Sequence, residues 1–453
     1  MSHTRLTAAV AAVALTLSGC AGVGAGRTES APSNAVTPTG ALNIMGFGGD
    51  DEVAQARIGL FAKTYPQVTV THNKGDFDAQ QFLTAVASGN PPDLVYMDRN
   101  LIGTYAAKGV LTPLKDCISS QGIDMSSYRE AAVRSVTLKG DVYGIPEFYV
   151  VTTNLVDARA LSQAGVPLSD IQTKDWNALK VTSAKLAKVQ GSTVQRIGFD
   201  PKLPEMFPLW AEANGATLVN DNGSPNLASP QAVEALAFSS SLIQDQGGWS
   251  SFQAFRNSFD IFGAKNPLTV DAVSVTPMEN WYVNVLTPYA GKGLQLQSTP
   301  FTDKSGKPIS MVGGSAWAIP KGAKNPSAAC AWAKTMTSTD AWMAAAEARR
   351  QKVDQKGTFF TGLFTANKAA DEQIKQKYLT KVSDPGFQQA IDNYYAVLDT
   401  GVALNPSPAG AEIDAAWKSA VTRVLEGKQS PQDALDQAQK EAQTAYDKVK
   451  GNG

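Results

Sequence analysis

The chain has 453 residues, of which 43% are apolar and 18% charged, a composition that supports a hydrophobic core and a length that allows more than one domain. Its formal net charge is −1 at pH 7, with both signs mixed along the chain, so we expect no basic face and no nucleic-acid partner. The only two histidines, His3 and His72, exclude a histidine-rich zinc site. We therefore predict no metal, no cofactor and no catalytic site built on histidine.

The N-terminus is typical of an export signal that ends at Cys20. Arg5 supplies a positive charge, an apolar segment follows, and Leu-Thr-Leu-Ser-Gly directly precedes the cysteine. This pattern resembles a bacterial lipobox, in which the cysteine carries lipid once the signal has been removed. A secretory signal with an incidental cysteine is the alternative. The resemblance predicts a signal peptide over 1–19 and, over the Gly-, Ser- and Thr-rich residues 20–39, a flexible tether.

Strands and helices alternate in the first part of the body. Residues 41–45, 68–70 and 93–97 are short apolar stretches typical of strands. A helix is predicted after the first stretch, with Asp50 or Asp51 as its N-cap and Pro66 as its end. Further helices are predicted over 78–88 and up to residue 109. This alternation predicts a mostly parallel sheet with helices on both faces.

The later part of the chain also has predicted strands between predicted helices, but it contains more helix. Strands are predicted at 196–199, 268–275 and 312–319, and helices at 158–164, 176–189, 207–214, 230–245, 325–337, 340–348, 385–397, 412–426 and 431–450. Besides Cys20, the chain has Cys117 and Cys330. In an oxidising compartment these two could form a disulfide, and two separate buried thiols are the alternative.

Short blocks along nearly the whole chain resemble the extracellular solute-binding proteins of carbohydrate ABC importers, the group related to maltose-binding protein. The blocks are residues 61–70, 85–94, 109–114, 140–146, 312–320, 325–332 and 417–421. The chain departs from the family pattern after Pro146, where the family usually has a Tyr-Asn pair and this sequence has Thr153-Asn154.

The resemblance implies an α/β fold with two lobes, the type II-like periplasmic-binding-protein fold. Each lobe would be a mixed sheet flanked by helices, and the chain would cross between them three times, near 147–152, 308–312 and 361–367. We expect 40–148 plus 312–363 in the N-terminal lobe and 149–311 plus 364–450 in the C-terminal lobe. Ligand would bind in the cleft, outside the carboxyl ends of parallel strands, and the lobes would close by hinge motion.

Sugar recognition needs aromatic faces for the apolar side of a pyranose and planar polar groups for its hydroxyls. The residues that the resemblance places at the cleft are Asp50, Asp51, Gln80, Asp98, Glu147, Tyr149, Trp210, Asn280, Trp281, Trp317, Arg349 and Trp417. Helix capping is the alternative role for the aspartates, core packing for Trp210 and Trp317, and a solvated helix end for Arg349.

Together these features predict a monomeric, lipid-anchored substrate-binding component of an ABC importer on the extracytoplasmic face of the membrane. It would capture a mono- to oligosaccharide and deliver it to the permease subunits. Three alternatives remain open. A glycerophosphodiester would use Arg349 and an amino sugar the acidic loops. A lipid-anchored glycoside hydrolase would pair Asp51 with Asp98 or Glu147. An adhesion or scaffold lipoprotein would have no small-molecule cleft.

Overall fold

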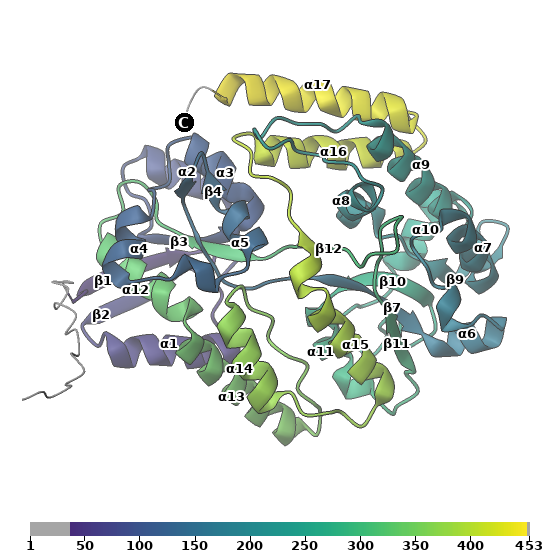
Figure 1. Ribbon diagram of the computed structural model, residues 1–453, viewed down its shortest axis with the longest axis horizontal. Coiled ribbons are helices and arrows are strands. Elements are labelled where there is room, and N and C mark those ends of the chain that lie inside the picture. Colours follow the sequence, from purple (N-terminus) through teal and green to yellow (C-terminus); the bar gives the residue numbers. More distant parts are fainter. Residues whose placement is uncertain (1–36, 451–453) are drawn as a thin grey trace, which may run out of the picture. The chain divides into compact units, whose positions relative to one another are not determined.

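A computed structural model of the chain describes residues 37–450, which belong to one compact unit. The predicted signal peptide, Cys20 and all but the end of the predicted tether lie outside the described residues. The described part of the chain is built around two five-stranded sheets that helices surround (Figure 1). Between residues 37 and 450, no helix is both long and apolar enough to cross a membrane.

The first sheet has the strand order β2-β1-β3-β13-β6. Its strands are β1 Gly40–Met45, β2 Val68–His72, β3 Leu94–Asp98, β6 Ile145–Pro146 and β13 Ser315–Ala318. Strands β2, β1 and β3 are parallel, as predicted, because helices α1 (Glu52–Thr64) and α2 (Ala79–Ala87) return the chain between them. Strand β13 arrives from far along the chain and pairs antiparallel with β3 and β6.

The second sheet has the strand order β11-β7-β10-β9-β8. Its strands are β7 Thr152–Asp157, β8 Lys188–Gln190, β9 Thr193–Phe199, β10 Val273–Glu279 and β11 Leu296–Thr299. Only β9 and β10 pair in parallel, and the other pairs are antiparallel. The mixed sheets predicted for the two lobes are thereby confirmed. The predicted mostly parallel sheet is not found, because only the β2-β1-β3 part of the first sheet is parallel and its other two strand pairs are antiparallel.

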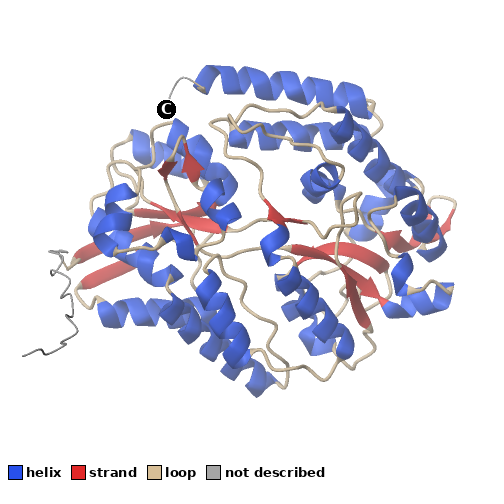
Figure 2. Ribbon diagram, in the orientation of Figure 1, coloured by secondary structure: helices blue, strands red, loops and turns tan. Residues whose placement is uncertain are grey.

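Helices cover both sheets (Figure 2). The helices with the first sheet are α1, α2, α3 Arg99–Ala107, α4 Lys115–Gln121, α5 Glu130–Ser135, α12 Pro326–Thr337, α13 Thr339–Lys356 and α14 Lys368–Tyr378. Those with the second are α6 Ala158–Ala164, α7 Trp176–Leu186, α8 Leu203–Ala213, α9 Pro230–Gln244, α10 Gly248–Arg256, α11 Trp281–Leu286 and α15 Pro385–Ala396. Helices α16 (Gly410–Leu425) and α17 (Pro431–Val449) pack together, and α16 contacts both α3 and α8.

The segments that connect the two sheets lie side by side and bond to one another. The Tyr149 amide donates to the Phe364 carbonyl (3.0 Å), and Val150 exchanges two backbone hydrogen bonds of 3.0 Å with Gly313. Strand β12 (Ser310–Met311) pairs with β14 (Gly401–Val402) beside them. The three segments predicted as crossings therefore meet in space, joined by 401–402, which the sequence did not single out. Of these segments, 361–367 connects α13 to α14, which both lie with the first sheet. Helix α14 packs on α13 beside the first sheet, whereas α15 packs on β11 and β7 of the second sheet, so the chain passes from one sheet to the other between α14 and α15. The predicted lobe boundaries stay a prediction.

Most helix boundaries lie within a few residues of the prediction, but several elements differ. The helix predicted at 207–214 begins at Leu203, and the strand predicted at 312–319 is confined to Ser315–Ala318. The strand predicted at 268–275 begins at Val273, because the Asn266 side chain accepts from the Leu268 amide (3.0 Å) and closes a turn there. The helix predicted at 176–189 ends at Leu186, where the chain leaves for β8. The helix predicted at 340–348 extends to Lys356.

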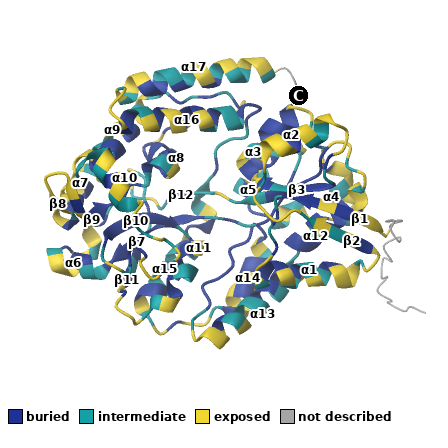
Figure 3. Cartoon of the chain, turned by 180° about the vertical axis from the view of Figure 1, so that it is seen from behind, coloured by how far each residue is buried: buried dark blue, intermediate teal, exposed yellow. Residues whose placement is uncertain are grey.

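Large buried side chains fill the space between sheets and helices. Figure 3 shows the central strands of both sheets in the buried class and exposed residues along outer helices such as α17. Cys117 on α4 and Cys330 on α12 form a disulfide, which decides between the two alternatives left open by the sequence.

Candidate functional site

A cavity of about 840 Å3 lies between the two sheets and is lined from both sides. The loop after β1 contributes Asp51 and the end of β3 contributes Asp98. The end of β10 contributes Glu279, and the start of α11 contributes Asn280 and Trp281. The crossings form another wall and α16 a further one. The carboxyl ends of strands from both sheets therefore open on one space, the position at which open α/β sheets bind ligands.

Asp51 and Asp98 follow two neighbouring parallel strands and differ in what they bond. The Asp51 carboxylate accepts from the Ala54 amide (2.7 Å) and so caps α1. Asp98 stands at the start of α3 without a side-chain capping bond; the Ser315 hydroxyl lies 3.5 Å from its Oδ1. Burial raises the pKa of Asp98, and Ser315 opposes the shift. Asp98 therefore keeps a carboxylate oxygen available to a ligand hydroxyl.

Trp281 presents an apolar face at the second-sheet side of the cavity. It is 37% exposed, unusual for so large an apolar side chain. Its indole Nε1 donates to Glu279 Oε2 at 2.9 Å, which fixes the orientation of the ring. Asn280 beside it is buried, and its Nδ2 donates to the Tyr149 carbonyl (3.1 Å). Asn280 thus holds the start of α11 against the first crossing.

Helix α16 brings three side chains to the cavity on one face. Asp414, Trp417 and Lys418 follow the i, i+3, i+4 spacing of a helix surface. Lys418 Nζ lies 2.6 Å from Asp414 Oδ2. Trp417 is only 2% exposed, yet its indole Nε1 has no hydrogen-bond partner among the described residues. A buried donor without a partner at a cavity wall suits a polar ligand atom.

Tyr149 forms part of the cavity wall at the first crossing. The Arg99 and Arg129 guanidinium carbons lie 5.7 Å and 5.3 Å from its ring centroid. Burial raises the pKa of Tyr149 to about 12, so its hydroxyl stays neutral at physiological pH. Arg99 itself donates to the Phe148 carbonyl (2.5 Å) and to the Gly313 carbonyl, which ties two crossings together below the cavity.

The charges around the cavity are unbalanced towards acid. Its acidic side chains are Asp51, Asp98, Glu205, Glu279 and Asp414, against Arg99, Arg349 and Lys418. Each of these cations is already engaged. Arg349 bonds to Glu52 and lies 3.6 Å from Asp51, while Lys418 pairs with Asp414 and Arg99 with backbone carbonyls. The arrangement favours a neutral, hydroxyl-rich ligand, or a cationic one, over an anion.

Seven of the predicted site residues line the cavity: Asp51, Asp98, Tyr149, Asn280, Trp281, Arg349 and Trp417. The binding role of each stays a proposal. The remaining five do not line it. Asp50 is exposed and pairs with Lys74 (2.6 Å), and Gln80 is exposed on α2.

Glu147, Trp210 and Trp317 are fully buried instead, each at 0% exposure. Glu147 forms an ion pair with Arg57, and the Trp210 indole donates to the Pro201 carbonyl (2.8 Å). The Trp317 ring packs at centroid distances of 5.0 Å from Phe47 and 4.6 Å from Tyr96. Core packing, the alternative left open for both tryptophans, is therefore what the structure shows.

Other lining residues were not singled out from the sequence. Tyr96 precedes Asp98 by two positions on β3, so strand alternation puts both on one face. Asp414 and Lys418 share a helix face with Trp417. These spacings were visible in the sequence once Asp98 and Trp417 had been chosen. Among residues 37–450, no group of three or more His, Cys, Asp or Glu side chains is placed to hold a metal ion.

Known proteins match this chain along most of its length. The family profile of the bacterial extracellular solute-binding proteins matches residues 56–351, more than half of the chain. A lactose-binding protein of Rhizobium radiobacter is 26% identical over 183 residues, which span 39% of this chain and 42% of that protein.

Solved structures resemble the fold more completely. The binding protein CpMnBP1 with mannotriose bound has a TM-score of 0.70 and 25% identity, covering 89% of this chain and 100% of that one. An ABC substrate-binding protein from Listeria monocytogenes in complex with cycloalternan has a TM-score of 0.70 at 18% identity, covering 90% and 98%. The two-lobed solute-binding fold predicted from the sequence is confirmed. The chain belongs to the family of bacterial extracellular solute-binding proteins.

Proposed function

We propose that this protein is the substrate-binding component of an ABC importer and that it captures a neutral carbohydrate in the cavity between its sheets. The observation that carries the proposal is the pairing of Trp281, an exposed indole face at the cavity, with the carboxylate of Asp98, which caps no helix. An apolar face and a planar acceptor are the two groups that a pyranose needs. Sugars bound by relatives, lactose and mannotriose among them, support this class of ligand.

A panel of ligands tests the proposal. The full-length chain is heated with mono-, di- and trisaccharides, amino sugars, polyols and glycerophosphodiesters, and its melting temperature is followed. Because a ligand that binds only the folded state stabilises it, we expect one class of sugar to raise the melting temperature. If every compound leaves it unchanged, the proposal is wrong.

An amino sugar is the second candidate, and the acidic excess of the cavity favours it. Among the described residues, neither Asp98 nor Glu279 forms an ion pair with a cationic side chain, so either carboxylate could accept a hydrogen bond from a ligand ammonium group. A glycerophosphodiester has less support, because Arg349 is already engaged by Asp51 and Glu52. In the panel, an amino sugar that outcompetes its neutral parent would select this candidate.

We further propose that the chain is held to the outer face of the cell membrane by lipid on Cys20 and works as a monomer beside its permease. The order of residues around Cys20 supports the anchor, and the family is extracellular. Growth with a radiolabelled fatty acid should label the protein, and Cys20→Ala should abolish the label and release the protein from the membrane fraction. Equal labelling of the variant would contradict the anchor.

A further inference from the structure

Phe262 is the most exposed of the large apolar side chains in the described part of the chain, with 64% of its surface accessible. It lies in the loop 257–272 between α10 and β10. Its ring stacks on Trp281, with centroids 5.7 Å apart and planes inclined by 23°. Trp281 lines the cavity and Phe262 does not, so the pair extends an apolar surface from the cavity outwards.

The loop that carries Phe262 is held in place by hydrogen bonds. The Phe262 amide donates to Asp260 Oδ1 (2.9 Å), which fixes the turn before the ring. Asn266 is fully buried, and its Nδ2 donates both to the Ile261 carbonyl (2.6 Å) and to the hydroxyl of Tyr282. Because Tyr282 follows Trp281 directly on α11, Asn266 ties the Phe262 turn to the helix that carries Trp281.

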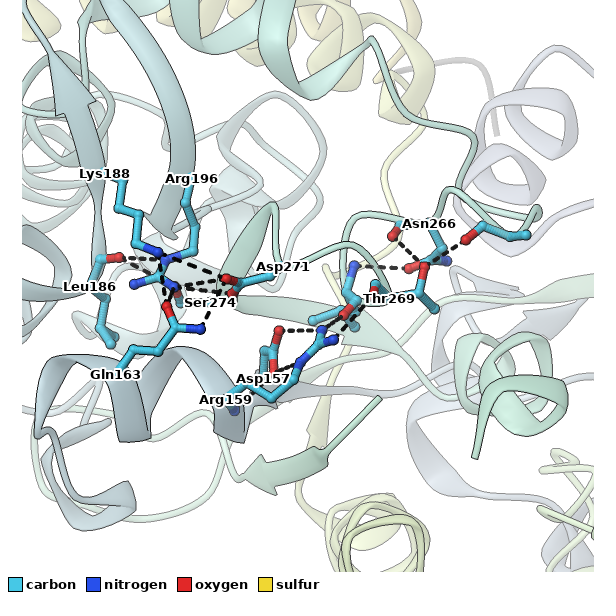
Figure 4. A network of polar contacts seen from close by, with 12 residues as sticks. Asp157, Arg159, Gln163, Leu186, Lys188, Arg196, Asn266, Thr269, Asp271 and Ser274 are labelled. Atoms are coloured by element: carbon cyan, nitrogen blue, oxygen red, sulfur yellow. Dashed lines mark hydrogen bonds and ion pairs between the residues drawn. The ribbon is translucent and has the colours of Figure 1, made fainter. Parts of the chain in front are cut away.

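A second set of contacts anchors the far end of the same loop, as Figure 4 shows. Arg159 Nη1 donates to the Thr269 carbonyl (3.2 Å), and its Nη2 pairs with Asp157 (2.6 Å), which ends β7. Asp271 lies 3.1 Å from Arg196 on β9. Because both ends of the loop are held by these contacts, the folded protein keeps Phe262 next to Trp281 even though the Phe262 ring is exposed to solvent.

We propose that Phe262 and Trp281 form one extended stacking platform, and that Phe262 takes a second or third sugar ring of an oligosaccharide. The inference rests on the proposed function and makes it narrower, since it assigns the preferred ligand a length greater than one ring. Although Phe262 stacks on Trp281, 64% of its surface remains accessible, and covering apolar surface of this kind with the apolar face of a sugar is favourable. Phe262 is then a specificity-determining residue for chain length.

Binding of sugars of increasing length to the full-length chain tests this assignment. Mannose, mannobiose and mannotriose, and glucose, maltose and maltotriose, are titrated by calorimetry into the wild type and Phe262→Ala. We expect Phe262→Ala to weaken binding of the longer sugars of the recognised series about five- to tenfold, which is the worth of one aromatic contact, and to leave the monosaccharide unaffected. Phe262→Tyr, which keeps the ring, should retain the wild-type preference.

Val181→Ala is the matched control, because Val181 is also exposed (55%) but lies on α7 away from the cavity lining. Equal weakening at every length would mean that Phe262 only supports Trp281, and it would overturn the inference. Unchanged affinity at every length would overturn it as well. A wild type that responds to no sugar of the ligand panel would overturn the carbohydrate assignment itself, a result distinct from normal binding with an unchanged length preference.

Discussion

Glu212 on α8 has a carboxyl group whose environment moves its pKa towards neutral pH. Burial raises its pKa from 4.5 to about 7, while a backbone hydrogen bond at Leu218 and the charge of Arg134 oppose the shift. Between these two pH values the folded chain holds a proton that the unfolded chain has lost. The contribution of Glu212 to the free energy of unfolding therefore falls as pH rises from about 4.5 to about 7 and levels off above.

Glu212→Gln removes this proton linkage. Glutamine stays neutral, so the variant does not lose this stability as pH rises. We expect the difference in unfolding free energy between variant and wild type to shift by about 2 kcal/mol in favour of the variant from pH 5 to pH 8. Urea unfolding at both pH values measures it. The control is Glu372→Gln at an exposed position on α14. An unchanged difference between wild type and Glu212→Gln at the two pH values would show that Glu212 is not buried in this way.

The sequence predicts which residue types a sugar site needs better than it predicts where they point. Asp51, Asp98 and Trp281 follow strand ends, and the direction of a parallel strand already places such positions at the cavity. Trp317, in contrast, lies within β13, where only the opposing layer decides whether an indole is covered. Phe47 and Tyr96 cover it, and neither contact is local in sequence.

The loop that enters β13 shows how closely the crossings approach one another. Gly314 has a φ of +126°, and a Cβ there would lie 2.2 Å from the Phe148 carbonyl oxygen and 2.7 Å from Arg99 Nη1. Gly313, its neighbour, has room, since its nearest atom would be 3.6 Å away in Val150. Only a glycine at 314 lets the backbone of the second crossing pass the first.

Gly314→Ala should therefore destabilise the protein where Gly313→Ala does not. The added methyl group meets backbone atoms that cannot move aside, so we expect a loss of about 2–4 kcal/mol in unfolding free energy for Gly314→Ala and less than about 1 for Gly313→Ala. Denaturant titration of the two variants gives the comparison. Similar stability for both would mean that the crossings are more widely separated than described.

Helices with a complete local signal were predictable from the sequence alone. Helices α9, α12, α15 and α17 each begin with a Ser, Asn or Asp cap followed by proline, and each starts within one residue of its predicted position. The two-residue strands β6, β12 and β14 carry no such signal, because they are defined only by partners distant in the chain. The crossings are built from these strands, so their hydrogen bonds could not be predicted.

At the scale of the whole molecule, the Cys117–Cys330 disulfide closes a covalent loop with a sequence separation of 213 residues. A loop of this length loses much conformational freedom in the unfolded state when it is closed. The bond joins α4 to α12 beside the first sheet, and neither cysteine lines the cavity. It should therefore affect stability and leave ligand affinity unchanged.

Replacing both cysteines with serine separates these two properties. We expect the double variant to lose about 2–5 kcal/mol of unfolding free energy, which is the usual contribution of a native disulfide, while its sugar affinity stays within about twofold of wild type. Unfolding in urea and calorimetric titration at a temperature where both proteins are folded provide the two values. Wild-type stability in the double variant would argue that the two thiols are not bonded.

The central claim is that a sugar binds in the cavity between the sheets, against Trp281. Calorimetric titration of the full-length chain and of Trp281→Ala, with the sugar selected by the panel, tests it most directly. Trp249→Ala on α10 is the control, since Trp249 lies outside the cavity lining. We predict that Trp281→Ala weakens binding about tenfold or more without unfolding the protein, while Trp249→Ala binds as wild type. Wild-type affinity in Trp281→Ala would place the ligand elsewhere and contradict the account.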